Sequence, residues 1–134
     1  MNTVKNILFV CGHNAGRSQM AEAYFNHVNT NAEYIAISCE THPTKQINPL
    51  VKKMLEQNDI PTHDLFPEMI TNEYKNNAAK IFTMGCGVDC SIFSAEMQIT
   101  GLGLSDPHQQ NEETISIIFQ EIQRIIHKII ASNI

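Results

Sequence analysis

Short apolar runs alternate with stretches of helical periodicity, and this alternation most constrains the fold of the chain. The three clear runs are NILFV (residues 6–10), EYIAISC (33–39) and AKIFTM (79–84). They are rich in β-branched and aromatic residues and are bounded by polar or turn residues, which is typical of strands. A fourth candidate, MQITGLGL (97–104), is weaker because two glycines loosen it.

Between and after these runs, apolar residues recur every three or four positions, as they do in amphipathic helices. The predicted helices cover residues 18–29, 49–58, 67–74 and about 20 residues after Asn111. The last helix carries a stripe of isoleucines, which we interpret as packing against a sheet rather than as a coiled-coil seam. Strands that alternate with helices predict a parallel sheet with right-handed crossovers.

Length and charge limit the classes of protein that fit. The 134 residues predict one domain over residues 1–134, and we expect a monomer. No apolar run approaches the roughly 20 residues of a membrane span, and the run after Lys5 is too brief for a secretory signal, so we expect a cytoplasmic protein without membrane contact. The net charge of −5 argues against a nucleic acid partner. Of the four cysteines, Cys39 should be a buried packing residue.

The segment CGHNAGRS, residues 11–18, lies between the first predicted strand and the first predicted helix. Its glycines allow backbone N–H groups to converge, and the positive end of the helix dipole points into the same space. This combination is typical of a loop that binds an anion. The candidate oxyanion-binding residues are Gly12, His13, Asn14, Ala15, Gly16, Arg17 and Ser18.

Cys11 and Arg17 give this loop the means for nucleophilic chemistry. Inward amides, the helix dipole and the guanidinium would lower the pKa of the Cys11 thiol, and the Ser18 hydroxyl could donate to the sulfur. The guanidinium can also hold two oxygens of a tetrahedral oxyanion while Cys11 attacks the central atom. A nucleotide-binding GxxxxGK[ST] loop fits poorly, because one intervening residue is missing and arginine replaces lysine.

The stretch VCGHNAGRSQMAEAYF resembles the opening of the low-molecular-weight protein tyrosine phosphatase superfamily, and RSQMAEA resembles its thioredoxin-coupled arsenate reductase branch. The resemblance extends over nearly the whole chain, through TMGCG and GLGLSDP. It implies an α/β three-layer sandwich with a four-stranded parallel sheet. It also implies that Cys11 is the nucleophile, Arg17 the oxyanion binder and Asp106 the general acid. Without the resemblance, Asp106 would be interpreted as an ordinary turn residue.

For the reductase branch, the resemblance implies a relay of three thiols. Cys11 attacks arsenate, Cys86 attacks Cys11 so that arsenite leaves, and Cys90 resolves the resulting disulfide. Thioredoxin would then reduce the Cys86–Cys90 disulfide, and no bound cofactor is needed. Cys86 and Cys90 are closer in sequence than in the best-known members, but disulfide closure depends on Cα separation and direction.

Three other functions remain open. A tyrosine phosphatase would hydrolyse phosphate monoesters through a phosphocysteine at Cys11 and needs no second cysteine. A zinc site at Cys86 and Cys90 is disfavoured because structural zinc usually has two close ligand pairs, so we expect no metal. A non-catalytic oxyanion-binding protein is disfavoured because all the catalytic residue types are present. In every case but zinc, the expected ligand is arsenate or a phosphate-like oxyanion.

Overall fold

Strands and helices alternate along the chain in the computed structural model. The structure describes residues 4–11, 16–40, 46–63, 65–66, 68–84, 99–101 and 111–132. The elements in these ranges are β1 (Lys5–Cys11), α1 (Gly16–Val28), β2 (Tyr34–Glu40), α2 (Pro49–Gln57), α3 (Asn72–Asn76), β3 (Ala78–Thr83), β4 (Ile99–Gly101) and α4 (Glu112–Ala131). The predicted alternation is confirmed.

The strands pair in parallel in the order β2-β1-β3-β4. β1 pairs on both sides, and its residues from Ile7 to Val10 are fully buried. Burial on both faces of a parallel sheet explains why this segment is a continuous apolar run rather than an alternating one. The predicted parallel sheet is confirmed. β4 is short, and the rest of the strand predicted over 97–104 lies outside the described residues.

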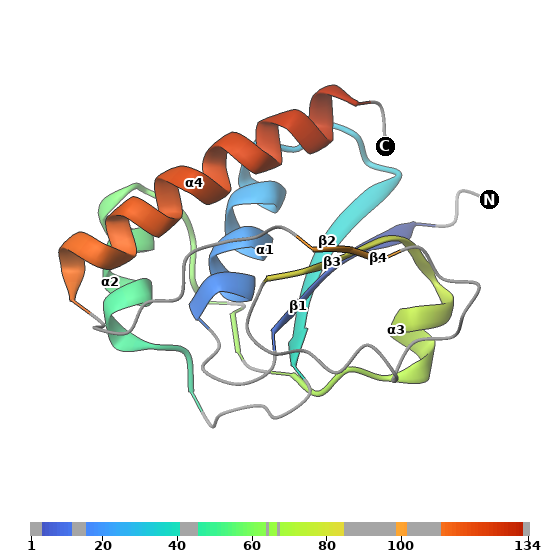
Figure 1. Ribbon diagram of the computed structural model, residues 1–134, viewed down its shortest axis with the longest axis horizontal. Coiled ribbons are helices and arrows are strands. Elements are labelled where there is room, and N and C mark those ends of the chain that lie inside the picture. The colour runs from blue at the N-terminus through green and yellow to red at the C-terminus, as the bar shows by residue number, and fades with distance from the viewer. Residues whose placement is uncertain are drawn as a thin grey trace.

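Helices lie on both faces of the sheet, with most of the packing on one of them (Figure 1). On that face Ile7 and Phe9 of β1 belong to an apolar cluster that also includes buried residues of α1, α2 and α4. On the opposite face Leu8 and Val10 form a smaller cluster, against which Tyr74 of α3 packs. Residues alternate between the two faces because side chains of a strand have a period of two.

The long helix α4 buries its predicted apolar stripe mainly against α1 and α2, in the same apolar cluster as Ile7 and Phe9 of β1. The buried residues of this stripe are Ile115, Ile118, Phe119, Ile122, Ile126 and Ile129. Asn111 caps the helix, since its side chain accepts a hydrogen bond from the N–H of Thr114 at 2.8 Å. The predicted start of this helix is therefore confirmed, and its isoleucines pack in the core.

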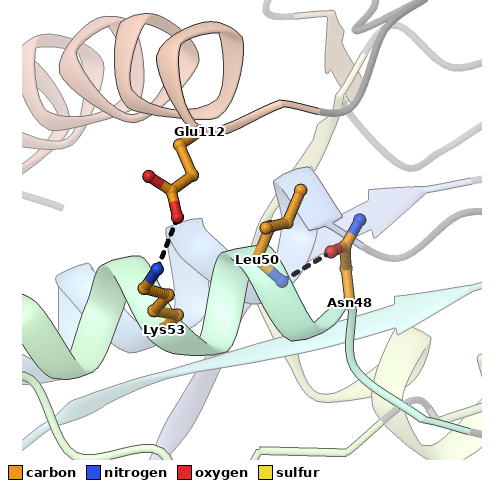
Figure 2. A network of polar contacts seen from close by, with 4 residues as sticks. All are labelled: Asn48, Leu50, Lys53 and Glu112. Atoms are coloured by element: carbon orange, nitrogen blue, oxygen red, sulfur yellow. Dashed lines mark hydrogen bonds and ion pairs between the residues drawn. The ribbon is translucent and has the colours of Figure 1, made fainter.

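An exposed ion pair joins the start of α4 to α2. Asn48 caps α2 by accepting a hydrogen bond from the N–H of Leu50 at 2.9 Å, and Lys53 Nζ lies 2.6 Å from Glu112 Oε1 (Figure 2). Both side chains of the ion pair are more than half exposed. Exposed pairs contribute about 0–1 kcal/mol, so buried apolar packing contributes most of the stability of this contact.

The helix predicted over residues 67–74 is wrong in position. The structure has a helix, α3, only from Asn72, capped by the Thr71 side chain, which accepts from the N–H of Tyr74. The preceding segment instead pairs with the end of β2: the N–H of Glu40 donates to the carbonyl of Glu68 at 2.8 Å, and the N–H of Ile70 donates to the carbonyl of Glu40 at 3.1 Å. Pairing with a sheet edge therefore overrides the local helical pattern.

Side chains of α1 bind backbone groups of Ala36 and Ser38 at the free edge of β2. Asn26 donates to the carbonyl of Ala36 at 3.0 Å and accepts from the N–H of the same residue at 2.9 Å. One turn earlier, Glu22 Oε1 accepts from the N–H of Ser38 at 2.8 Å and from its hydroxyl at 3.3 Å. An unpaired strand edge invites association with other chains, and α1 prevents this while holding itself beside β2.

Substituting alanine for Asn26 is expected to lower the free energy of unfolding by about 1–3 kcal/mol, because both backbone groups of Ala36 lose their partner. Urea denaturation of Asn26→Ala measures this loss. The Gln120→Ala variant, at an exposed position of α4, serves as control and should stay within about 0.5 kcal/mol of the wild type. Equal stability of all three proteins would contradict the bracing role of Asn26.

Candidate active site

The candidate site lies at the carboxyl edge of the sheet, where β1 and β2 end side by side. Cys11 is the last residue of β1 and Glu40 the last of β2, and they are Cα partners in the parallel register. Residues 12–15 alone connect β1 to α1. Ligands of parallel α/β sheets bind beyond this edge, and a helix N-terminus offers them N–H groups and positive potential. The backbone therefore has the strand-loop-helix order that an anion-binding loop requires.

Arg17 and Ser18 lie in the first turn of α1, and both are buried. Arg17 is 4% exposed and Ser18 is fully buried. A guanidinium stays charged even when it is buried, so Arg17 brings positive charge to the start of α1. The Ser18 hydroxyl has no hydrogen-bond partner in the part of the chain that the structure describes. Two predicted site residues are thus adjacent in one helical turn that directly follows the loop.

Gly16 lets α2 pack closely against the start of α1. A Cβ atom at position 16 would lie 3.3 Å from Cγ2 of Val51, which is buried. Such a contact is tighter than ordinary van der Waals packing, so a larger residue would require Val51 or the turn that carries Arg17 to shift by a few tenths of an ångström. The helix α1 begins at Gly16, two residues before the predicted start near residue 18.

The remaining predicted site residues lie outside the described residues. These are Gly12, His13, Asn14, Ala15, Cys86, Cys90 and Asp106, together with the side chain of Cys11. The position of the Cys11 sulfur relative to Arg17 and Cys86 therefore stays a prediction.

Cys39 lies one residue before the end of β2 but has a different environment from a reactive cysteine. It is fully buried among Leu8, Val10 and Ile81. Burial, and then the negative charges of nearby glutamates, raise the pKa of its thiol to about 12. The thiol therefore stays protonated at neutral pH, and the prediction that Cys39 is a buried packing residue is confirmed.

The stability of the fold should decline in alkaline solution because of Cys39. Its thiol pKa is raised from 9.0 to about 12, so the folded state binds this proton more tightly than the unfolded state. The resulting stability is complete below pH 9 and is lost as the pH rises from 9 to 12. Urea denaturation across this range should show a steeper decline for the wild type than for Cys39→Ala. Identical pH dependence would contradict this account. Tyr74, whose pKa is raised to about 12 mainly by its hydrogen bond to Glu68, contributes in both proteins.

Two fully buried polar residues beside the site, Gln19 and Glu40, were not predicted from the sequence. Glutamine and glutamate are mostly exposed in proteins, so apolar periodicity does not single them out. What could have indicated them is their position near the predicted site residues: Gln19 directly follows Arg17 and Ser18 in the sequence, and Glu40 ends the strand whose last residue pairs with Cys11.

Within the described ranges, no three or more His, Cys, Asp or Glu residues are close enough to hold a metal ion. Cys86 and Cys90, the residues of the zinc hypothesis, lie outside these ranges. Of the helices that the structure describes, none combines the length and the apolar character that crossing a membrane requires.

Comparison with known protein families identifies the fold. The model of the family described as low molecular weight phosphotyrosine protein phosphatase matches residues 6–132. The chain belongs to this family. The match confirms the resemblance found in the sequence and, with the parallel sheet, assigns the low-molecular-weight phosphatase fold.

Relatives within this fold include both reductases and phosphatases. A Halobacterium salinarum protein named "Putative arsenate reductase" is 25% identical over 124 residues, which cover 88% of this chain and 86% of that protein. The solved thioredoxin-dependent arsenate reductase of Corynebacterium glutamicum is 28% identical with a TM-score of 0.79, covering 97% of this chain and 62% of that chain. This chain thus spans less than two thirds of that reductase. The low-molecular-weight tyrosine phosphatase of T. tengcongensis has the same fold, with a TM-score of 0.78, 19% identity and coverage of 96% and 99%.

Proposed function

We propose that this protein reduces arsenate to arsenite with a relay of three cysteines, Cys11, Cys86 and Cys90, that thioredoxin regenerates. The observation that carries the proposal is the buried Arg17 in the first turn of α1, directly after the strand that ends in Cys11. A buried guanidinium at a helix N-terminus favours both a thiolate and a tetrahedral oxyanion. The protein would need no bound cofactor and would act in the cytoplasm.

In the first step, the Cys11 thiolate attacks the arsenic atom of arsenate and forms a sulfur–arsenic bond. One arsenate oxygen leaves as water, for which Asp106 supplies the proton. Arg17, Ser18 and the N–H groups of the loop hold the remaining oxygens, whose negative charge they balance in the transition state.

In the second step, the Cys86 thiolate attacks the Cys11 sulfur, and a disulfide forms between the two cysteines. The electron pair of the broken sulfur–arsenic bond stays on arsenic, so arsenic(V) leaves as arsenite, arsenic(III). Cys90 then attacks Cys86, which frees Cys11 and leaves a Cys86–Cys90 disulfide. The dithiol of thioredoxin reduces this disulfide and is itself oxidised, so that two electrons pass from thioredoxin to each arsenate.

Two relatives support the reductase over other members of the family, since one is named as an arsenate reductase and one as a thioredoxin-dependent arsenate reductase. The segment RSQMAEA and the cysteine pair in TMGCGVDC support the same choice. The second candidate is phosphate monoester hydrolysis, which the description of the matching family favours. It would use Cys11, Arg17 and Asp106 in the same roles, with water in place of Cys86 in the second step.

A coupled assay separates the two candidates. The purified protein is mixed with thioredoxin, thioredoxin reductase and NADPH, and the arsenate-dependent loss of NADPH is compared with hydrolysis of an aryl phosphate. We expect arsenate-dependent oxidation of NADPH that requires thioredoxin. Hydrolysis of the aryl phosphate without any arsenate-dependent oxidation of NADPH would instead assign the phosphatase. If the protein showed neither activity, the remaining candidate would be a non-catalytic oxyanion-binding protein.

A further inference from the structure

Three buried polar atoms in the first turn of α1 have no hydrogen-bond partner among the residues that the structure describes. Two of them are the carbonyl oxygen Oε1 and the amide nitrogen Nε2 of Gln19, which is fully buried. The third, within the same described ranges, is the hydroxyl oxygen of the adjacent Ser18. The same turn contains the buried Arg17 on which the proposed function depends.

A buried amide without partners is unfavourable and uncommon in folded proteins. The amide of Gln19 carries two donor hydrogens and a carbonyl acceptor, and burial removes the water that would bind them. A methionine, as in the neighbouring Met20, has a similar volume and avoids this cost. A glutamine at this position is therefore favourable only when a small polar group binds it. Buried water molecules typically make about three hydrogen bonds to such groups, and Gln19 with Ser18 offers three atoms.

The direction of helical side chains places this amide at the beginning of α1. Side chains of a helix lean toward its N-terminus, and residues three apart share a face. By this rule Gln19 and Gly16 share a face of α1, the face on which Val51 lies close to Gly16. A group bound by Gln19 would contact the turn that carries Arg17.

We propose that Gln19 is a positioning residue of the oxyanion site, whose amide binds an internal water molecule and thereby fixes the first turn of α1. The same water donates to the Ser18 oxygen, which leaves the single Ser18 proton for the oxyanion. This inference rests on the proposed function, since it assigns a role to a residue beside the same site. Gln19 acts through Arg17 and the helix N-terminus, and it does not touch the substrate. It should matter for oxyanion affinity and contribute little to the stability of the fold.

The Gln19→Met variant tests this role. All proteins in this binding test also carry Cys86→Ser, so that arsenate cannot drive Cys11 into a disulfide. Inorganic arsenate is titrated, and the rate at which iodoacetamide alkylates Cys11 is read by mass spectrometry, while the midpoint of thermal unfolding is measured in parallel. We expect the dissociation constant of arsenate to rise about tenfold, which corresponds to one or two lost hydrogen bonds, while the unfolding midpoint is equal to or above that of the wild type. Gln123→Met, the same substitution at a half-buried position of α4, should change neither quantity.

Two results would overturn the inference. An unchanged dissociation constant would show that Gln19 does not position the site. A lower unfolding midpoint together with weaker binding would show that the amide is a structural group with partners in the fold. Failure of the proposed function gives a separate result, because the protein without substitutions would then show no thioredoxin-dependent oxidation of NADPH with arsenate, whatever Gln19→Met does to arsenate affinity.

Discussion

The Cys11→Ser variant is expected to lose arsenate reduction and aryl phosphate hydrolysis together, each by a factor on the order of 10³ or more. A serine hydroxyl at the end of β1 is not ionised at neutral pH, whereas in the proposed mechanism the helix dipole and Arg17 favour the ionised form of the cysteine. Without a thiolate, neither a sulfur–arsenic nor a sulfur–phosphorus bond can form. Both activities are measured under saturating substrate, and urea denaturation checks that the variant is folded.

Cys39→Ala is the matched control for this variant. Cys39 lies on the adjacent strand β2, where it is the register partner of Val10, one residue before the pair of Cys11 and Glu40. Because its thiol is buried and its pKa is raised to about 12, the control should retain both activities. Full activity of Cys11→Ser, or loss of activity in a folded Cys39→Ala, would assign the nucleophile to another residue.

The Cys86→Ser variant is expected to lose thioredoxin-coupled arsenate reduction by a factor on the order of 10³, yet keep aryl phosphate hydrolysis within about twofold. The reason is chemical: release of arsenite requires a second sulfur to attack Cys11, whereas water can hydrolyse a phosphocysteine. The same pair of assays measures both effects in one preparation. Arsenate reduction at the wild-type rate would rule out a relay through Cys86.

The pattern of apolar residues predicted those strands and helices whose burial follows a regular pattern along the whole element. β1 is buried on both faces and reads as a continuous apolar run, and α4 has a single buried stripe that repeats every three or four residues. The anion-binding loop stays a prediction, and it rests on a different signal, the glycines and the arginine between a strand and a helix.

Contacts between distant segments decided the features that were not predicted. Residues 68–70 pair with the free edge of β2, so the helix that local periodicity predicted over 67–74 begins later, at Asn72. Asn26 braces the same edge although nothing in the sequence of α1 marks it as a partner of Ala36. Burial of a polar residue such as Gln19 depends on what packs around the start of α1, which the local sequence does not determine.

The most direct test of the relay is to stop it after one turnover. The Cys90→Ser variant, fully reduced and freed of reductant, is incubated with arsenate, and its disulfides are mapped by mass spectrometry while arsenite is counted. The proposed mechanism predicts a disulfide between Cys11 and Cys86 and about one arsenite released per chain, because no third thiol remains to resolve the disulfide. Reduced thiols with no arsenite released, or a disulfide that includes Cys39, would contradict it.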